Sequence, residues 1–102
     1  MNMGDLMKQA QQFQQKLAEI QQELGGKTVT GVSGGGMVTA TFNGRSEMIG
    51  ISIEKEVVNT EDLQLLQDLV VSAVNDGLVK AKQVGQAELG KLTGGINIPG
   101  LF

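Results

Sequence analysis

The segment of this chain that comes nearest to a chemical motif is residues 85–91. Its sequence, Gly-Gln-Ala-Glu-Leu-Gly-Lys, matches the first seven positions of a phosphate-binding loop, in which backbone amides and a lysine surround phosphates. The eighth position is Leu92, where that loop needs Ser or Thr to hold Mg²⁺, and the preceding residues have a helical pattern instead of a strand pattern. We therefore interpret the segment as the end of a helix and predict no cofactor.

The remaining residue types include few of the groups that catalysis commonly uses. The chain has no cysteine and no histidine, which excludes thiolate and imidazole catalysis, disulfides, and zinc sites built from Cys or His. Ser33 precedes three glycines, as in an anion nest or a nucleophile elbow, but no histidine can act as its base and no helix follows. A hairpin turn is the better interpretation, and we predict that the protein is not an enzyme.

Four carboxylates, Glu54, Glu56, Glu61 and Asp62, form the one cluster that suggests a metal ion. A calcium site needs six or more oxygen ligands that converge on one point. An acidic loop followed by a helix start explains the same run, because negative charge is favourable in the first turn of a helix. We predict no metal site.

The lysines are candidates for contacts with phosphate groups, although the net charge is −3. Residues 54–76 hold one lysine against six acidic residues, which gives −5, whereas residues 77–102 hold three lysines against one glutamate, which gives +2. Lys80 and Lys82 project about 200° apart on a helix, so they cannot form one tight patch. The predicted DNA-binding residues are Lys8, Lys16, Lys80, Lys82 and Lys91.

The composition is that of one small folded domain, residues 1–102. Hydrophobic residues make up 40% and charged residues 19% of the 102 residues. No apolar run approaches the roughly 20 residues that span a bilayer, and no signal segment is evident, so we expect a cytoplasmic protein without a membrane partner. Aromatic residues are only 3%, which disfavours stacking on nucleic-acid bases.

The N-terminal segment, about residues 3–24, is predicted to be a helix with an apolar stripe. Asn2 can cap its start, and Gly25-Gly26 can end it in left-handed geometry. The apolar positions alternate steps of three and four, which is the seam of a coiled coil. They are Met3, Leu6, Ala10, Phe13, Leu17, Ile20 and Leu24.

Three antiparallel strands are predicted at about 27–33, 37–43 and 46–53, because β-branched residues alternate there between glycine-rich turns. Asn43-Gly44 predicts a type I′ hairpin, in which both central residues have positive φ. Ile49, Ile51 and Ile53 are expected to line one face of the third strand. The sheet would thus offer an apolar face to a layer of helices.

A second helix is predicted over about 60–90, capped by Thr60. At 1.5 Å per residue it would be roughly 45 Å long, whereas a globule of this size has a radius of gyration of only ~13 Å. We therefore expect a homodimer, with part of the helix projecting or lying on the partner, and an apolar tail, 91–102, docked as a strap. Residues predicted to pack in the core or the dimer are Leu6, Phe13, Leu17, Ile20, Leu66, Val70 and Ala73.

Several strings are similar to motifs of the YbaB/EbfC family. They are Met7–Gln11, Val29–Gly36, Phe42–Gly44, Asp68–Asp76, and Gly90–Gly95 followed by Ile98–Leu101. The resemblance covers nearly the whole chain and implies an α+β subunit and a layered homodimer with projecting helical arms. It also implies a nucleoid-associated protein that binds double-stranded DNA, with roles in nucleoid organisation and gene regulation and no small-molecule substrate. The alternative is a scaffold or assembly factor that binds proteins through its helices and tail.

Overall fold

The structure, a computed structural model, describes residues 2–92 and has the predicted order of elements. The predicted tail lies outside the described residues from position 93 onward. The α+β fold class is confirmed, with one short 3-10 helix, η1, added after the last strand. The elements are α1 (Met3–Gly25), β1 (Thr28–Ser33), β2 (Val38–Asn43), β3 (Met48–Ile53), η1 (Lys55–Val57) and α2 (Leu63–Leu92).

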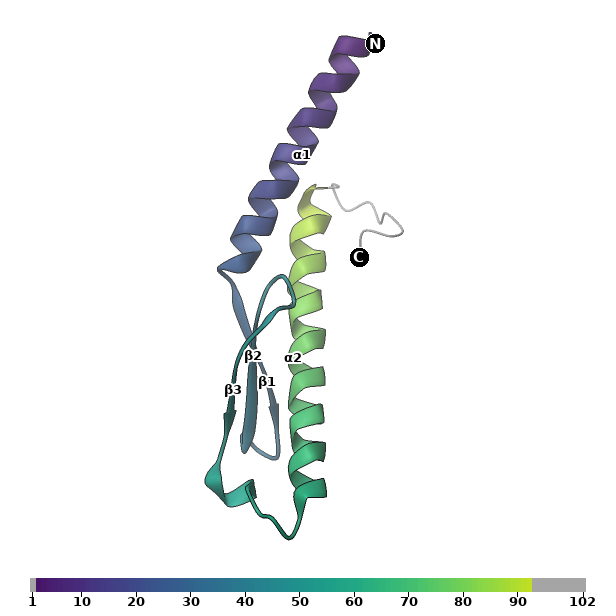
Figure 1. The fold of residues 1–102 in the computed structure, drawn as a ribbon. Helices are drawn as coiled ribbons and strands as arrows, with labels where there is room; N and C mark the ends of the chain where they lie inside the picture. Colours follow the sequence, from purple (N-terminus) through teal and green to yellow (C-terminus); the bar gives the residue numbers. More distant parts are fainter. Residues whose placement is uncertain (1, 93–102) are drawn as a thin grey trace.

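The three strands form an antiparallel meander in the order β1-β2-β3, and α2 runs along one face of it (Figure 1). The helix packs mainly on β1 and β2. Between the two layers lies a core in which small residues of α2 meet larger residues of β2. Its buried members are Val38, Ala40, Phe42, Val57, Ala73 and Ala81, and Leu66 and Val70 pack against them half-buried.

A pair of glycines sets how closely α2 approaches the sheet. A Cβ atom on Gly31 of β1 would lie 2.1 Å from the backbone nitrogen of Gly77, and one on Gly77 would lie 2.6 Å from the Phe42 ring. Both distances are shorter than van der Waals contact, so larger residues there would force the layers apart. Gly77 weakens α2 by up to about 1 kcal/mol relative to alanine, but it makes room for Phe42.

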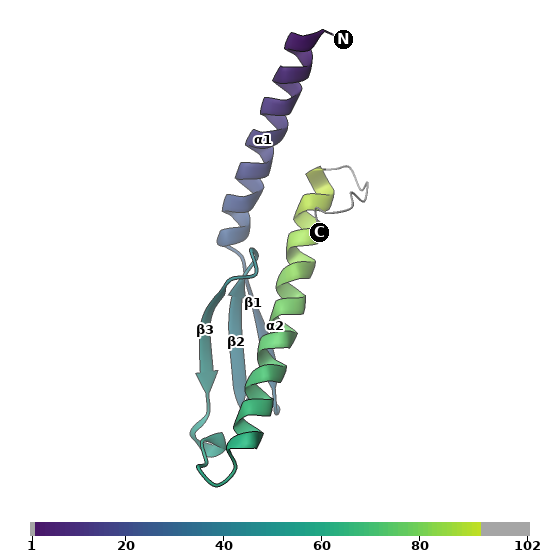
Figure 2. The same cartoon turned by 45° about the vertical axis from the view of Figure 1, so that its right-hand side comes forward.

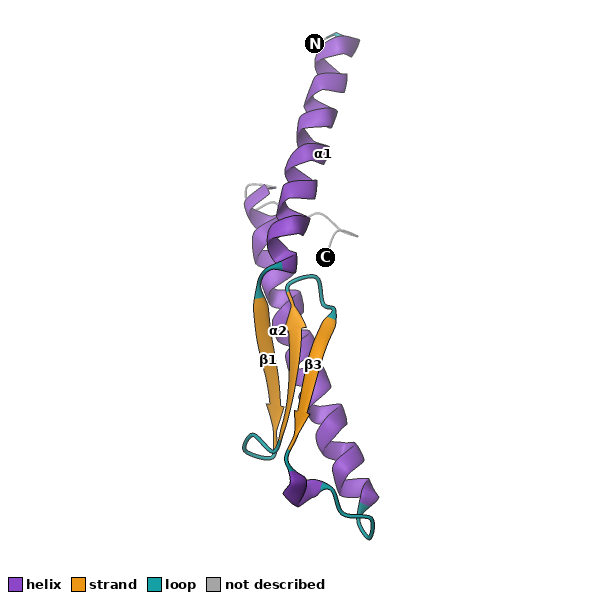
Figure 3. Ribbon diagram, turned by 60° about the vertical axis from the view of Figure 1, so that its left-hand side comes forward, coloured by secondary structure: helices purple, strands orange, loops and turns teal. Residues whose placement is uncertain are grey.

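The apolar face predicted for β3 is present, but α2 leaves it uncovered. Ile51 pairs with Ala40 and Ile53 with Val38, so these isoleucines face the same way as the core residues of β2. A register shift between Thr41 and Phe42 leaves Ile49 out of this row. All six residues of β3, an outer strand of the sheet (Figure 3), are exposed, so within residues 2–92 the predicted helix layer does not cover this part of the apolar face.

The connections before and after the strands differ in detail from those predicted. Gly26 ends α1 in right-handed geometry, with φ −92° and ψ −7°, so the predicted left-handed cap is wrong. In the β2–β3 connection the residue with positive φ is Ser46, at 65°, and not Asn43 or Gly44. The connection is thus longer than a type I′ turn, and the close approach of Gly44 to Leu24 explains its glycine, since a Cβ would lie 2.8 Å from the Leu24 carbonyl oxygen.

The N-terminal caps of the two helices can be assigned from their hydrogen bonds. Asn2 Oδ1 accepts from the Asp5 backbone N–H at 2.8 Å, which confirms the predicted cap of α1. At α2 the prediction of Thr60 is wrong, because Asp62 Oδ1 accepts from the Leu65 N–H at 3.2 Å and the helix begins at Leu63. Thr and Asp are both favourable N-cap residues, and Asp62, which directly precedes Leu63, is the one that caps α2.

The described chain is elongated, with a radius of gyration of 18.9 Å and extents of 69 × 22 × 17 Å. The cause is α1, whose N-terminal part extends well beyond the end of α2 (Figure 2). Along the coiled-coil seam, Leu24 is buried and Leu17 and Ile20 are half-buried, whereas Leu6 and Phe13 are 50% and 41% exposed. Half of the predicted stripe therefore has no partner within the described part of the chain.

Candidate nucleic-acid interface

The predicted lysines lie in four different surroundings. Lys8 and Lys16 lie on the exposed surface of α1, and within residues 2–92 neither forms an ion pair. Both positive charges are therefore available to a ligand along the projecting helix.

Lys80 lies at the outer edge of β1 and is engaged there. Its Nζ donates to the Thr30 carbonyl at 3.0 Å and to Asp76 Oδ2 at 3.1 Å, while the same carboxylate oxygen accepts from the Val32 N–H at 3.0 Å. The backbone hydrogen bond to Val32, followed by the bond to Lys80, lowers the pKa of Asp76. Two side chains of α2 thus occupy backbone groups at the free edge of β1.

Lys91 shares a carboxylate with Lys27, a residue between α1 and β1. Glu88 Oε1 accepts from Lys27 Nζ at 2.6 Å and from Lys91 Nζ at 3.1 Å, and Glu88 is only 8% exposed. The bonds from Lys27 and then Lys91 lower the pKa of Glu88, because they favour its ionised form. This cluster ties the end of α2 to the start of the sheet and partly neutralises Lys91.

Among residues 2–92, a hollow on the Arg45 side and a hollow on the Glu88 side lie where α1 meets α2, and they differ in charge. The first, here called the basic hollow, has a volume of about 450 Å³ and contains Arg45 and Lys82 with no carboxylate in its wall. The second, of about 350 Å³, is lined by two lysines and three glutamates, a net charge of −1: Lys16, Lys91, Glu19, Glu23 and Glu88. Lys82 and Lys91 therefore line different hollows, and Lys16 shares one with Lys91.

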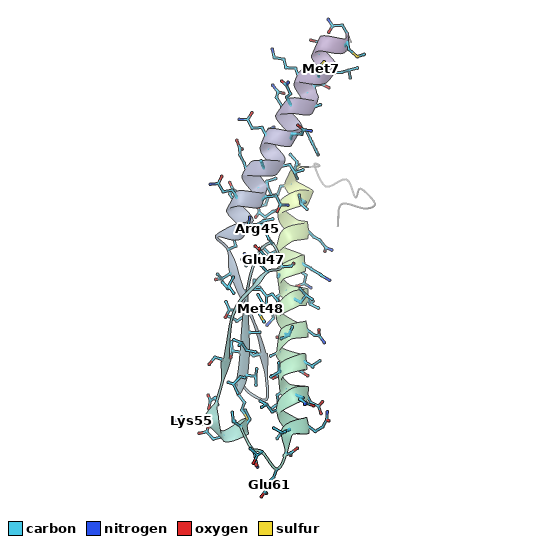
Figure 4. All side chains as sticks on the ribbon, viewed as in Figure 1. Met7, Arg45, Glu47, Met48, Lys55 and Glu61 are labelled. Carbon is cyan, nitrogen blue, oxygen red and sulfur yellow. The ribbon has the colours of Figure 1, made fainter. Side chains whose placement is uncertain are left out.

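Arg45 was not among the predicted site residues, and a rigid turn positions it at the base of α1 (Figure 4). Asn43 Oδ1 accepts from the backbone N–H groups of Arg45 at 2.9 Å and Glu47 at 3.1 Å, and its own side chain donates to Glu47 Oε1. The Arg45 guanidinium pairs with Glu47 through Nε at 3.2 Å and lies over Gly25. The pair Asn43-Gly44 predicts a turn, but it does not predict that this turn brings an arginine to the end of a helix.

These features define a small α+β protein with one projecting helix and a basic hollow at its base. A family model described as the YbaB/EbfC DNA-binding family matches residues 1–96. The chain belongs to this family, which confirms the resemblance noted in its motifs. The family is described by DNA binding and not by a catalytic activity.

Relatives agree with this assignment, and a solved structure shares the fold. The chain is 50% identical to a nucleoid-associated protein of Caldanaerobacter subterraneus, over 99% of this chain and 91% of the relative. It is 48% identical to a nucleoid-associated protein of Desulfotalea psychrophila, over 99% and 95% of the two chains. The crystal structure of the uncharacterized protein HP0035 from Helicobacter pylori superposes with a TM-score of 0.83 at 24% identity, covering 91% of this chain and 98% of that one, and supports the fold.

Neither helix of the described residues is long and apolar enough to cross a membrane.

Proposed function

We propose that this chain is a nucleoid-associated protein that binds duplex DNA as a homodimer, with roles in nucleoid organisation and gene regulation. The observation that carries the proposal is the match of a DNA-binding family to residues 1–96. The relatives named as nucleoid-associated proteins support the same assignment and a location on the nucleoid.

The homodimer is supported by apolar surface that one chain leaves uncovered. Ile51 and Ile53 continue the core face of the sheet beyond the edge of α2, and they are 45% and 39% exposed. Exposed apolar side chains also lie on α2, at Leu63, Leu65, Val71 and Val79. A second copy seated on the β3 side would remove Ile51 and Ile53 from water at roughly 25 cal/mol per Å² of apolar surface.

In such a dimer two copies of α1 would form a pair of arms. Each arm carries Lys8 among uncharged glutamines, which suits contacts to phosphates with little reading of base sequence. Lys16 lies in the hollow that also holds three glutamates, so it would contribute less. Lys82 would add charge at the base of each arm. Lys80 and Lys91, already bound to carboxylates, would contribute less.

A salt titration tests DNA binding. The affinity for two duplexes of unrelated sequence is measured by fluorescence anisotropy between about 20 and 200 mM salt. We expect similar affinities for both duplexes and a linear fall of log Kobs with log salt concentration, because bound phosphates release counterions. Absence of binding even at the lowest salt would contradict the proposal.

The exposed stripe of α1 favours one other function, that of a scaffold that binds proteins. Leu6 and Phe13 are accessible there, and apolar residues in this spacing are recognised by partner helices. Pull-down from lysate with and without nuclease separates the two functions. A protein partner that persists after nuclease treatment, together with no affinity for purified duplex, would favour the scaffold.

A further inference from the structure

We propose that the basic hollow holds a phosphodiester of the DNA backbone, with Arg45 and Lys82 as its ligands. The inference rests on the proposed function and adds the place where the duplex is gripped. It shifts the main contact from the middle of the arms to their base, and it assigns a role to an arginine that no sequence motif marked.

The charges of the two hollows indicate which of them can bind a phosphate. The wall of the basic hollow holds two cations and no carboxylate, because Glu47, which pairs with Arg45 Nε, is not among its lining residues, whereas a phosphate in the neighbouring hollow meets three glutamates and two lysines. Like charges at contact distance are unfavourable even near a protein surface, where the effective dielectric constant is about 20. The difference predicts that DNA approaches the junction of α1 and α2 from the Arg45 side.

The cations of the basic hollow have donors to offer. Lys82 forms neither an ion pair nor a hydrogen bond within residues 2–92, so all three of its N–H groups are available. Arg45 uses Nε for Glu47, and this bond leaves the two terminal nitrogens of the guanidinium for a second acceptor. A guanidinium whose outer edge is free can bind two phosphate oxygens at once.

Arg45 is also held in place before any ligand arrives. The Gly44 N–H donates to the carbonyls of Leu24, at 2.8 Å, and Lys27, at 3.1 Å, which joins the turn to the end of α1. Asn43, only 5% exposed, fixes the turn from within. Fewer degrees of freedom are lost on binding when the donor already sits on a rigid turn, so a contact here contributes more than one from a free lysine.

The wall around the two cations suits a phosphodiester. Gln21 of α1, Gln86 of α2 and Ser46 of the turn can donate to the remaining phosphate oxygens or to sugar oxygens. Leu24 and Leu89 complete the wall with apolar surface, on which the hydrocarbon part of a deoxyribose can rest. None of these groups distinguishes one base from another.

The test compares charge-removing variants at two places. Arg45→Gln and Lys82→Gln are made in the full chain, with Lys55→Gln as the matched control. Lys55 is exposed, forms no ion pair within residues 2–92, and lies at the opposite end of the sheet from Arg45 (Figure 4). All three variants remove one positive charge, so a change of net charge alone would affect them equally.

We expect Arg45→Gln and Lys82→Gln each to weaken duplex binding several-fold and to lower the slope of log Kobs against log salt by about 1 for each hollow that the DNA occupies. Lys55→Gln should leave the slope unchanged, and Arg45→Lys should restore most of it. Thermal melts accompany each variant, because the predicted loss concerns binding by a folded protein.

If the wild type binds DNA but Arg45→Gln and Lys82→Gln keep its slope, the hollow is not a phosphate site and the inference is overturned while the proposed function stands. If the wild type binds no duplex at all, the proposed function itself fails. A separate titration with a mononucleotide distinguishes a phosphodiester of DNA from a free phosphate ligand. If micromolar mononucleotide saturates the basic hollow and the slope of log Kobs against log salt for duplex binding stays unchanged, the inference is also overturned.

Discussion

The two outer strands of the sheet have the same length and opposite surroundings. The edge of β1 is occupied, since Asp76 accepts from the Val32 N–H and Lys80 donates to the Thr30 carbonyl, and α2 packs directly on its glycine. The strand β3 has none of this cover, and its isoleucines are exposed. An exposed apolar edge strand invites pairing with another chain, and proteins usually protect it. The comparison shows that α2 covers the β1 and β2 part of the sheet, and in the proposed homodimer a second copy would cover β3.

The largest effect on the free energy of unfolding is expected when one methyl group is added to each outer strand of the sheet in turn. Gly31→Ala on β1 places a Cβ 2.1 to 2.2 Å from backbone atoms of α2, whereas around Gly50 on β3 nothing lies within 4 Å. We expect Gly31→Ala to lower the free energy of unfolding by about 3 kcal/mol and Gly50→Ala to change it by less than about 0.5 kcal/mol. Urea denaturation at one fixed protein concentration measures both. Equal effects would mean that the two strands are not packed differently.

The next prediction concerns the face of the sheet that a partner would cover. Ile51 and Val32 are 45% and 46% exposed, but Ile51 pairs with buried Ala40, whereas Val32 pairs with Thr39. A carboxylate inside an apolar interface is costly, so Ile51→Glu should weaken the dimer at least about 100-fold, equivalent to about 2.7 kcal/mol. Val32→Glu should leave it intact. Sedimentation equilibrium measures the dimer dissociation constant of both variants. A dimer that is weakened by Val32→Glu and not by Ile51→Glu would place the interface on the other face of the sheet.

A smaller effect is expected at Gly77, where α2 meets Phe42. In Gly77→Ala the gain in helix propensity, about 1 kcal/mol, opposes the cost of pushing the Phe42 ring aside, about 1–3 kcal/mol. We expect a net loss of roughly 1 kcal/mol in the free energy of unfolding. Combining Gly77→Ala with Phe42→Leu should cost less than the sum of the single changes, because the smaller side chain leaves room for the methyl group. Strict additivity in this double-mutant cycle would contradict the close contact.

The smallest prediction is a pH dependence at the β1 edge. The pKa of Asp76 is lowered from its ordinary value of 3.8, first by the Val32 N–H and then by Lys80. Ionised Asp76 therefore stabilises the folded state above that value, and the contribution is lost as the pH falls below it. Thermal melts of Asp76→Asn should show a shallower acid dependence than the wild type. Glu61→Gln removes one charge from an exposed loop and is the control, which should keep the wild-type profile.

Much of this fold follows from local patterns in the sequence. The heptad spacing of α1, the alternation in the strands and the Asn2 cap are all present as predicted, because each depends on residues close together in the chain. The uncovered row on β3 could not be foreseen. Periodicity identifies an apolar face, but only the packing of α2 decides which half of the sheet it covers, and the close contact of Gly31 with Gly77 sets that position.

The candidate interface was predicted less completely. Helical spacing correctly separated Lys80 from Lys82, yet it could not show that Lys80 bonds to the edge of β1 or that Lys91 shares Glu88 with Lys27. Arg45 was missed because it lies about 20 residues from the helix end that it covers, counted from Gly25, and no local pattern reports such a contact.

The proposed function requires that two chains act together on one duplex. Sedimentation velocity of the protein alone and with a 20-base-pair duplex at micromolar concentrations tests this claim directly. We predict a dimer without DNA and a complex of two chains per duplex, which dissociates as salt is raised. A stable monomer in the free protein, or one chain per duplex, would contradict it.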